Sequence, residues 1–370
     1  FFYMKNKALI RDNILLNVDP EGLKTQLEND INSLNTKESI TDESINVLVI
    51  GGSSGYGLAS RIALKEKANA HIVNVSLERE PKGKRMGSFG YYNNEFFKER
   101  FNDTVDINGD AFSFEIKEEV AKAYQDLGKK IDLVIYSLAS PVRVDPFTQV
   151  KYASALKPIG QSYTGLNVDI AKEILKEETL IPATQDEIDN TVKVMGGEDY
   201  YLWAKYLSEH DVLNQDVKFV TYTYVGPELT HDIYKNGTIG FAKRDLENYN
   251  EKIQEILNPL NGKAYISQSK AVITKASIFI PTMALYASAL FKVMKENNTH
   301  ETIVEHKYRL FKDYVFTGEE NATIPLDQYE MDPLVQDRVK ALLENLTDDN
   351  FKARVDFENF KKEFVALNGF

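Results

Sequence analysis

The chain has 370 residues, of which 43% are apolar and 27% are charged, as is usual for a soluble globular protein. Acidic residues outnumber basic ones by 56 to 44, and the net charge of −12 argues against general binding to nucleic acid or anionic membranes. The absence of cysteine excludes disulfides, thiolate metal sites and a cysteine nucleophile. The start of the chain has no apolar run typical of a signal peptide, so we expect a cytoplasmic protein without membrane insertion.

Predicted strands and helices alternate along the chain. The polar stretch 20–44 is expected to form a helix and then a loop. Further along, helices are predicted at 58–64, 238–257 and around 277–290, and apolar strands at 46–50, 71–75, 131–136, 217–225 and 264–267. Continuous apolar runs of this kind are buried on both faces, as in parallel sheets. The alternation therefore indicates an α/β fold with a doubly wound parallel sheet.

No Pro- or Gly-rich linker divides the chain, so we predict one large α/β domain over residues 1–370. A nucleotide-binding core is expected at about 45–140 and 215–295. Helical and loop insertions are expected at about 80–105, 141–200 and 296–370.

A glycine-rich loop follows the first predicted apolar strand and opens a helix. Its residues are Gly51, Gly52, Ser53, Ser54, Gly55, Tyr56 and Gly57. A phosphate can lie against the free N–H groups of a helix N-terminus, and glycines let the backbone approach it. The Gly-x3-Gly-x-Gly spacing is that of short-chain dehydrogenases, so we predict a Rossmann, short-chain-dehydrogenase-like sheet that binds a dinucleotide. A purely structural turn is the alternative.

Glu78 stands at the end of the next predicted strand, roughly 20 residues after the loop. A carboxylate there accepts hydrogen bonds from a ribose diol and repels a 2′-phosphate, which favours NADH over NADPH. The basic neighbours Arg79, Lys82, Lys84 and Arg85 could instead accommodate that phosphate.

A tyrosine and a lysine nine residues apart follow the predicted strand 217–225: Tyr234 and Lys243. That strand also carries Tyr224 to its carboxyl end, where ligands sit in open α/β sheets. An ammonium near a Tyr hydroxyl can lower its pKa and stabilise an oxyanion, so the pair is a candidate acid. The usual short-chain dehydrogenase spacing is four, and a chance pair nine apart is common.

Several segments of the chain closely resemble segments that occur in the same order in the trans-2-enoyl thioester reductase family. This family comprises FabV-type enoyl-acyl-carrier-protein reductases and trans-2-enoyl-CoA reductases. They span nearly the whole chain: 51–61, 109–113, 136–140, 156–160, 193–199, 222–227, 234–243 and 290–295. The Tyr-x8-Lys motif of Tyr234 and Lys243, with Gly-Thr-Ile-Gly at 237–240 inside it, is the family hallmark.

The resemblance implies a role for each matching position. Tyr234 would donate the proton, Tyr224 would orient the thioester substrate, and Lys243 would hold the cofactor. The implied cofactor-binding residues, running from the pyrophosphate to the nicotinamide, are Gly51, Gly52, Ser53, Ser54, Gly55, Tyr56, Leu77, Glu78, Asp110, Ala111, Leu138, Ala139, Val272, Ile273 and Thr274. The apolar segment after Thr274 would shape the acyl pocket.

The resemblance therefore implies an NADH-dependent enzyme that reduces the C2=C3 double bond of an enoyl-CoA or enoyl-acyl-carrier-protein, with hydride to C3 and a proton to C2. We also expect a monomer, no metal and no nucleic-acid partner. Departures from the family pattern at Tyr200, Gln268 and Ser269 leave substrate preference open. The alternatives are a short-chain-type 3-ketoacyl reductase, disfavoured by the missing Tyr-x3-Lys motif, and a non-catalytic NAD(H)-sensing protein, which would not need the Tyr/Lys pair.

Overall fold

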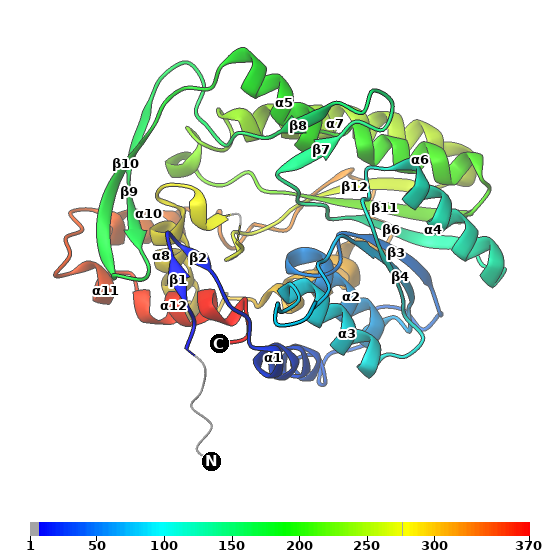
Figure 1. Ribbon diagram of the computed structural model, residues 1–370, viewed down its shortest axis with the longest axis horizontal. Helices are drawn as coiled ribbons and strands as arrows, with labels where there is room; N and C mark the ends of the chain where they lie inside the picture. The colour runs from blue at the N-terminus through cyan, green and yellow to red at the C-terminus, as the bar shows by residue number, and fades with distance from the viewer. Residues whose placement is uncertain (1–6, 276) are drawn as a thin grey trace.

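A seven-stranded parallel sheet forms the centre of the computed structural model, which describes residues 7–275 and 277–370 (Figure 1). The strand order is β13-β12-β11-β6-β3-β4-β5, so the chain starts in the middle and winds outward in both directions. The order reverses between β3 and β6, and open α/β sheets bind ligands beyond the strand ends at such a point. The predicted doubly wound sheet is confirmed.

The elements have the following bounds. The sheet consists of β3 (Asn46–Ile50), β4 (His71–Ser76), β5 (Val105–Asn108), β6 (Ile131–Tyr136), β11 (Leu213–Thr223), β12 (Lys263–Gln268) and β13 (Thr323–Pro325). Antiparallel pairs outside it are β1 (Ile10–Arg11) with β2 (Ile14–Leu15), β7 (Val142–Val144) with β8 (Lys151–Ala153), and β9 (Tyr163–Asp169) with β10 (Ile174–Leu180). The helices are α1 (Pro20–Asn32), α2 (Gly55–Lys67), α3 (Phe89–Arg100), α4 (Phe114–Leu127), α5 (Gln185–Met195), α6 (Glu198–Glu209), α7 (Thr238–Leu257), α8 (Met283–Glu296), α9 (Ile303–Leu310), α10 (Pro333–Leu343), α11 (Phe351–Arg354) and α12 (Phe357–Ala366).

Helices cover both faces of the sheet. Figure 1 shows α1, α2 and α3 below it and α4, α6 and α7 on the opposite side. One apolar core joins the sheet to α1, α2 and α9, and another joins it to α4, α6 and α7. Both cores form because the central strands carry apolar side chains on both faces.

A third apolar core lies at the carboxyl ends of the strands, around α8. This helix is buried on almost every side because β9 and the C-terminal helices α10 and α12 pack around it. A helix that is apolar all round needs such enclosure. The third core contains Tyr234 and Ile273, so it forms one wall of the predicted site.

Several element bounds differ from the predictions. The strand expected at 217–225 begins at Leu213 and ends at Thr223. The helix expected around 277–290 starts only at Met283, because Pro281 cannot donate to a helical hydrogen bond and Thr282 has a left-handed backbone. The helix expected to open with residues 58–64 starts three residues earlier, at Gly55.

Two segments expected as insertions contribute to the sheet layer. Residues 80–105 contain α3, which connects the adjacent parallel strands β4 and β5, and the segment 296–370 supplies the edge strand β13. Within the described residues, no helix is long and apolar enough to cross a membrane. Residues 1–6, part of the stretch read as lacking a signal peptide, lie outside the description.

Candidate active site

The glycine loop joins β3 to α2 at the switch point. Gly51 has a φ of +86°, and a Cβ there would lie 2.5 Å from the carbonyl oxygen of Ser137. A Cβ on Gly57 would lie 2.1 Å from the carbonyl oxygen of Gly51. Gly55, by contrast, faces open space at the first turn of α2. Gly51 and Gly57 therefore let the loop pack tightly, and Gly55 leaves the N-terminus of α2 open. We call this loop the glycine cradle; the free N–H groups and positive end of a helix N-terminus suit a pyrophosphate.

Glu78 lies beside this cradle. Its two carboxylate oxygens accept hydrogen bonds from the hydroxyls of Ser53 and Ser88, each at 2.5 Å. The side chain amide of Asn108 bridges to the backbone of Glu78. The carboxylate is thus fixed next to the loop, with lone pairs left for a ribose diol. The neighbouring Leu77 is 71% exposed.

The residues predicted near the adenine follow β5. The carbonyl oxygen of Ala111 accepts hydrogen bonds from the Trp203 indole at 3.1 Å and from the Lys117 ammonium at 2.9 Å. Lys117 is buried and also pairs with Asp199 at 2.8 Å. Asp110 caps its own turn by accepting from the backbone N–H of Phe112. This loop is therefore held rigidly from beneath.

Leu138 and Ala139 follow β6 on the other side of the switch point. The backbone N–H of Ser137 donates to the carbonyl oxygen of Ile50 at 2.8 Å, which ties this turn to the glycine loop. Leu138 is half-buried and Ala139 is exposed. Both residues therefore border the space above the cradle.

Tyr224 and Tyr234 are brought together although they come from different segments. Tyr224 follows the end of β11, and Tyr234 lies in the turn before α7. Their rings meet edge to face, with centroids 4.9 Å apart. Lys243 comes from the second turn of α7, and its ammonium donates to the carbonyl oxygen of Tyr222 at 3.4 Å. Within the described residues, no hydrogen bond joins Lys243 to Tyr234.

The protonation of this pair differs from the expectation that Lys243 lowers the pKa of Tyr234. Burial and the charge of Glu330 raise the pKa of Tyr234 instead. Burial lowers the pKa of Lys243 to about 8. In the protein alone Tyr234 therefore keeps its proton at neutral pH, which suits a hydrogen-bond and proton donor.

Val272, Ile273 and Thr274 lie in the segment after the carboxyl end of β12, and Val272 and Ile273 are buried. The hydroxyl of Tyr56 donates to the carbonyl oxygen of Lys270 at 2.6 Å and so connects the glycine loop to this segment. Ser277 bonds back to Thr274 through side chain and backbone. The predicted nicotinamide contacts thus stand close to the predicted pyrophosphate contacts.

A small apolar cavity of about 10 Å³, room for about one water molecule, lies beside Tyr234. It is lined by Tyr163, Leu229, Thr230, Ile233, Tyr234, Ile280, Pro281, Thr282 and Met283. Thr282 has a φ of +70°, which is strained for a β-branched residue. Bonds to β9 hold it there, from its N–H to the carbonyl oxygen of Leu166 and between its hydroxyl and that of Tyr163. Strain that neighbouring contacts enforce is common at ligand sites.

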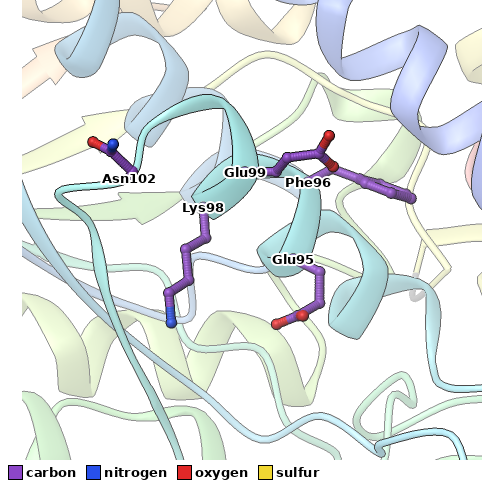
Figure 2. A pocket seen from close by; sticks show the side chains of 5 residues that line it. All are labelled: Glu95, Phe96, Lys98, Glu99 and Asn102. Atoms are coloured by element: carbon purple, nitrogen blue, oxygen red, sulfur yellow. The ribbon is translucent and has the colours of Figure 1, made fainter.

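A larger surface depression lies elsewhere, on α3. Figure 2 shows its lining side chains on α3 and, for Asn102, on the segment just after it: Glu95, Phe96, Lys98, Glu99 and Asn102. Glu99 is engaged by Lys24 of α1 at 2.7 Å. The depression contains none of the predicted site residues and is a shallow polar surface between ion-paired helices.

Sequence reasoning missed several buried polar residues around the site. The ammonium of Lys307 lies 4.1 Å from the ring centroid of Tyr56 and 3.7 Å from that of Tyr222, and it donates to Ser269. The carboxyl of Glu330 contacts Tyr224 at 2.8 Å. Each comes from a segment distant in the chain and carries no motif. The departure Tyr200 lies in the core against Tyr136, away from the site.

No group of three or more His, Asp or Glu side chains that could hold a metal occurs among residues 7–275 and 277–370.

The family models that match the chain are described as the NAD(P)H binding domain of trans-2-enoyl-CoA reductase (residues 5–83), the trans-2-enoyl-CoA reductase catalytic region (85–316) and the enoyl reductase FAD binding domain (319–370).

Named relatives match along most of their length. The chain is 44% identical to a trans-2-enoyl-CoA reductase (NADH) of Clostridium perfringens, over 95% of this chain and 92% of that one. It is 43% identical to an enoyl-acyl-carrier-protein reductase (NADH) of Idiomarina loihiensis, over 98% and 95%. A crystal structure of Clostridium acetobutulicum trans-2-enoyl-CoA reductase in complex with NADH superimposes with a TM-score of 0.95 and 36% identity, covering 99% of this chain and 94% of that chain.

Proposed function

The chain belongs to the trans-2-enoyl-CoA reductase family, and from that membership we propose how its own residues carry out the reaction. It is an NADH-dependent oxidoreductase that reduces the C2=C3 double bond of trans-2-enoyl thioesters, carried by CoA or acyl-carrier protein, to saturated acyl thioesters. The observation that carries the residue assignment is the edge-to-face contact between Tyr224, which follows the carboxyl end of β11, and Tyr234.

The residues present fit NADH. A Cβ on Gly51, Gly52 or Gly57 would collide with the protein and force the loop out of its shape, whereas Gly55 leaves the N-terminus of α2 open for the pyrophosphate. The fixed carboxylate of Glu78 suits the two hydroxyls of an unphosphorylated ribose and disfavours a 2′-phosphate. When bound, NADH supplies the hydride that is delivered to C3 of the substrate.

Tyr234 is the proposed proton donor. As the double bond is reduced, negative charge moves to the thioester oxygen, and a protonated phenol hydrogen-bonds and stabilises that oxygen. Tyr234 is 8% exposed and its raised pKa keeps the proton in place until the charge develops. Protonation at C2 completes the saturated acyl thioester. Tyr224, packed against the ring of Tyr234, orients the thioester.

Lys243 holds the cofactor in this proposal. Its ammonium is anchored on the carbonyl oxygen of Tyr222 and has two further protons to donate to ribose hydroxyls. The remaining assignments follow the path of the cofactor: Leu77, Asp110 and Ala111 at the adenosine, Leu138 and Ala139 along its middle, and Val272, Ile273 and Thr274 at the nicotinamide. The apolar segment after Thr274, which includes Ile280 and Met283 beside Tyr234, shapes the acyl pocket.

The test is NADH oxidation, followed by its near-ultraviolet absorbance, with crotonyl-CoA and then with an enoyl-acyl-carrier-protein. Turnover of either supports the proposal, and the ratio of the two kcat/KM values identifies the carrier. Turnover of neither, with NADH binding intact, would refute it and favour a 3-ketoacyl substrate or a sensor.

We further propose that the protein acts as a cytoplasmic monomer and that residues 1–370 form a single domain. The resemblance along the whole chain and the absence of a Pro- or Gly-rich linker support this.

A further inference from the structure

Glu330 lies between β13 and α10, and its carboxyl group is completely buried. One oxygen, Oε1, accepts hydrogen bonds from the hydroxyls of Tyr224 and Tyr286, both at 2.8 Å. The other, Oε2, accepts from the backbone N–H of Ala271 at 2.7 Å. A buried carboxyl without partners is strongly destabilising, so the three donors stabilise Glu330 in this position.

These three donors come from different parts of the site. Tyr224 follows β11, Tyr286 lies on α8, and Ala271 directly precedes the predicted nicotinamide contacts. The side chain of Gln336 on α10 fixes the arrangement, because it donates to the carbonyl oxygen of Glu330 at 2.6 Å and to the hydroxyl of Tyr286 at 3.1 Å. Glu330 therefore joins the substrate tyrosine to the C-terminal helices.

The direction of these bonds separates the roles of the two site tyrosines. Burial raises the pKa of Glu330, although the bonds from its three donors oppose that rise. In its carboxylate form the group only accepts, and a phenol has one proton, so Tyr224 donates its only proton to Glu330. Within the described residues, the hydroxyl of Tyr234 has no hydrogen-bond partner, so its proton is available for the substrate. The ring of Tyr224 is at the same time held against that of Tyr234.

We propose that Glu330 is a positioning residue for the reduction: it fixes Tyr224 so that Tyr234 alone presents a proton to the thioester oxygen. This inference rests on the proposed function, in which both tyrosines face the substrate. Glu330 itself touches neither substrate nor cofactor and acts through Tyr224.

The test is a double-mutant cycle of Glu330→Gln with Tyr224→Phe, read as kcat/KM for crotonyl-CoA at saturating NADH. A glutamine has only one acceptor oxygen and nearly the same volume. The backbone N–H of Ala271 can only donate, so it holds that oxygen, and the amide NH₂ turns toward Tyr224 and Tyr286, which lose their acceptor. Losing a bond to a charged group predicts a drop of about 10- to 100-fold in the wild-type background. In the Tyr224→Phe background, Glu330→Gln should lower kcat/KM by less than about threefold, because the hydroxyl that Glu330 positions is absent.

Two further variants make the cycle decisive. Gln336→Ala, at a half-buried position, loosens Glu330 without leaving a buried charge unpaired, so it replaces Glu330→Gln if that protein does not fold. Gln336→Ala should lower kcat/KM by about 3- to 10-fold in the wild-type background, and this loss should disappear in the Tyr224→Phe background. Tyr286→Phe is the matched control, because it removes the other hydroxyl that donates to Oε1 of Glu330. It should lower kcat/KM by less than about threefold.

Equal losses from Glu330→Gln in both backgrounds would overturn the inference, as would a Tyr286→Phe loss as large as that of Glu330→Gln. Thermal unfolding of each variant identifies losses that come from instability alone. A wild-type protein that does not turn over crotonyl-CoA or an enoyl-acyl-carrier-protein would instead refute the proposed function, before any variant is compared.

Discussion

Replacing Glu78 with alanine is expected to narrow the preference for NADH over NADPH. The carboxylate cannot swing away from the ribose, because the hydroxyls of Ser53 and Ser88 hold both of its oxygens at 2.5 Å. A 2′-phosphate would therefore have to approach a fixed negative charge. Removing that charge relieves the repulsion of NADPH and also removes two hydrogen-bond acceptors for the diol of NADH.

The magnitude follows from Coulomb's law. Two unit charges about 5 Å apart, at an effective dielectric constant of about 20, repel by about 3 kcal/mol, or on the order of 100-fold in binding. Glu78 is half-buried, so solvent and salt reduce this value, and we expect the NADH/NADPH ratio of kcat/KM to fall by about 10- to 100-fold.

The assay is steady-state oxidation of NADH and of NADPH with crotonyl-CoA at fixed ionic strength. Glu80→Ala is the matched control, since it removes the same charge from an exposed position two residues away. If the NADH/NADPH ratio of kcat/KM in Glu78→Ala stays within twofold of the wild-type ratio, the reasoning is refuted. So would an equal shift in Glu80→Ala, because the effect would then be a general change in surface charge.

Three further variants test other parts of the site. Tyr234→Phe should lower kcat by about 100-fold or more, as expected for loss of a general acid. The NADH dissociation constant, measured by fluorescence titration, should not change. Turnover within a few-fold of wild type would show that Tyr234 is not the donor. Gly51→Ala should abolish NADH binding and lower the unfolding temperature, because its Cβ would lie 2.5 Å from the carbonyl oxygen of Ser137 at a φ of +86°; unchanged calorimetric binding would contradict this. The NADH dissociation constant should rise as pH increases through about 8, because burial lowers the pKa of Lys243 to that value and only the ammonium donates all of its bonds. Lys243→Arg, which stays charged, should bind with no such rise, and an identical pH profile would refute the assignment.

The glycine loop, Glu78 and the order Tyr224, Tyr234, Lys243 could be identified from the sequence. Each belongs to a junction of strand, loop and helix whose geometry depends on residues close together in the chain. The same local rule predicted the bounds of β3, β6 and α7. Resemblance to a known family then supplied the chemistry that a Tyr/Lys pair nine residues apart does not specify.

Longer-range features required the tertiary structure. Glu330 lies 106 residues from Tyr224 and is surrounded by no motif, so nothing local marks its carboxyl as part of the site. The strained backbone of Thr282 depends on bonds to β9, more than a hundred residues earlier. The short edge strands β5 and β13 have too few residues for a periodic signal.

The protonation of the site likewise depends partly on local sequence and partly on the tertiary structure. The sequence placed an ammonium and a phenol in one region and predicted a lowered pKa for Tyr234. Folding raises that pKa instead, because the third core buries the ring and a distant carboxyl contributes its charge. Local sequence determined which chemical groups are present and in what order. The tertiary structure decided which of them keep their protons, because burial and the approach of charges depend on packing between segments far apart in the chain.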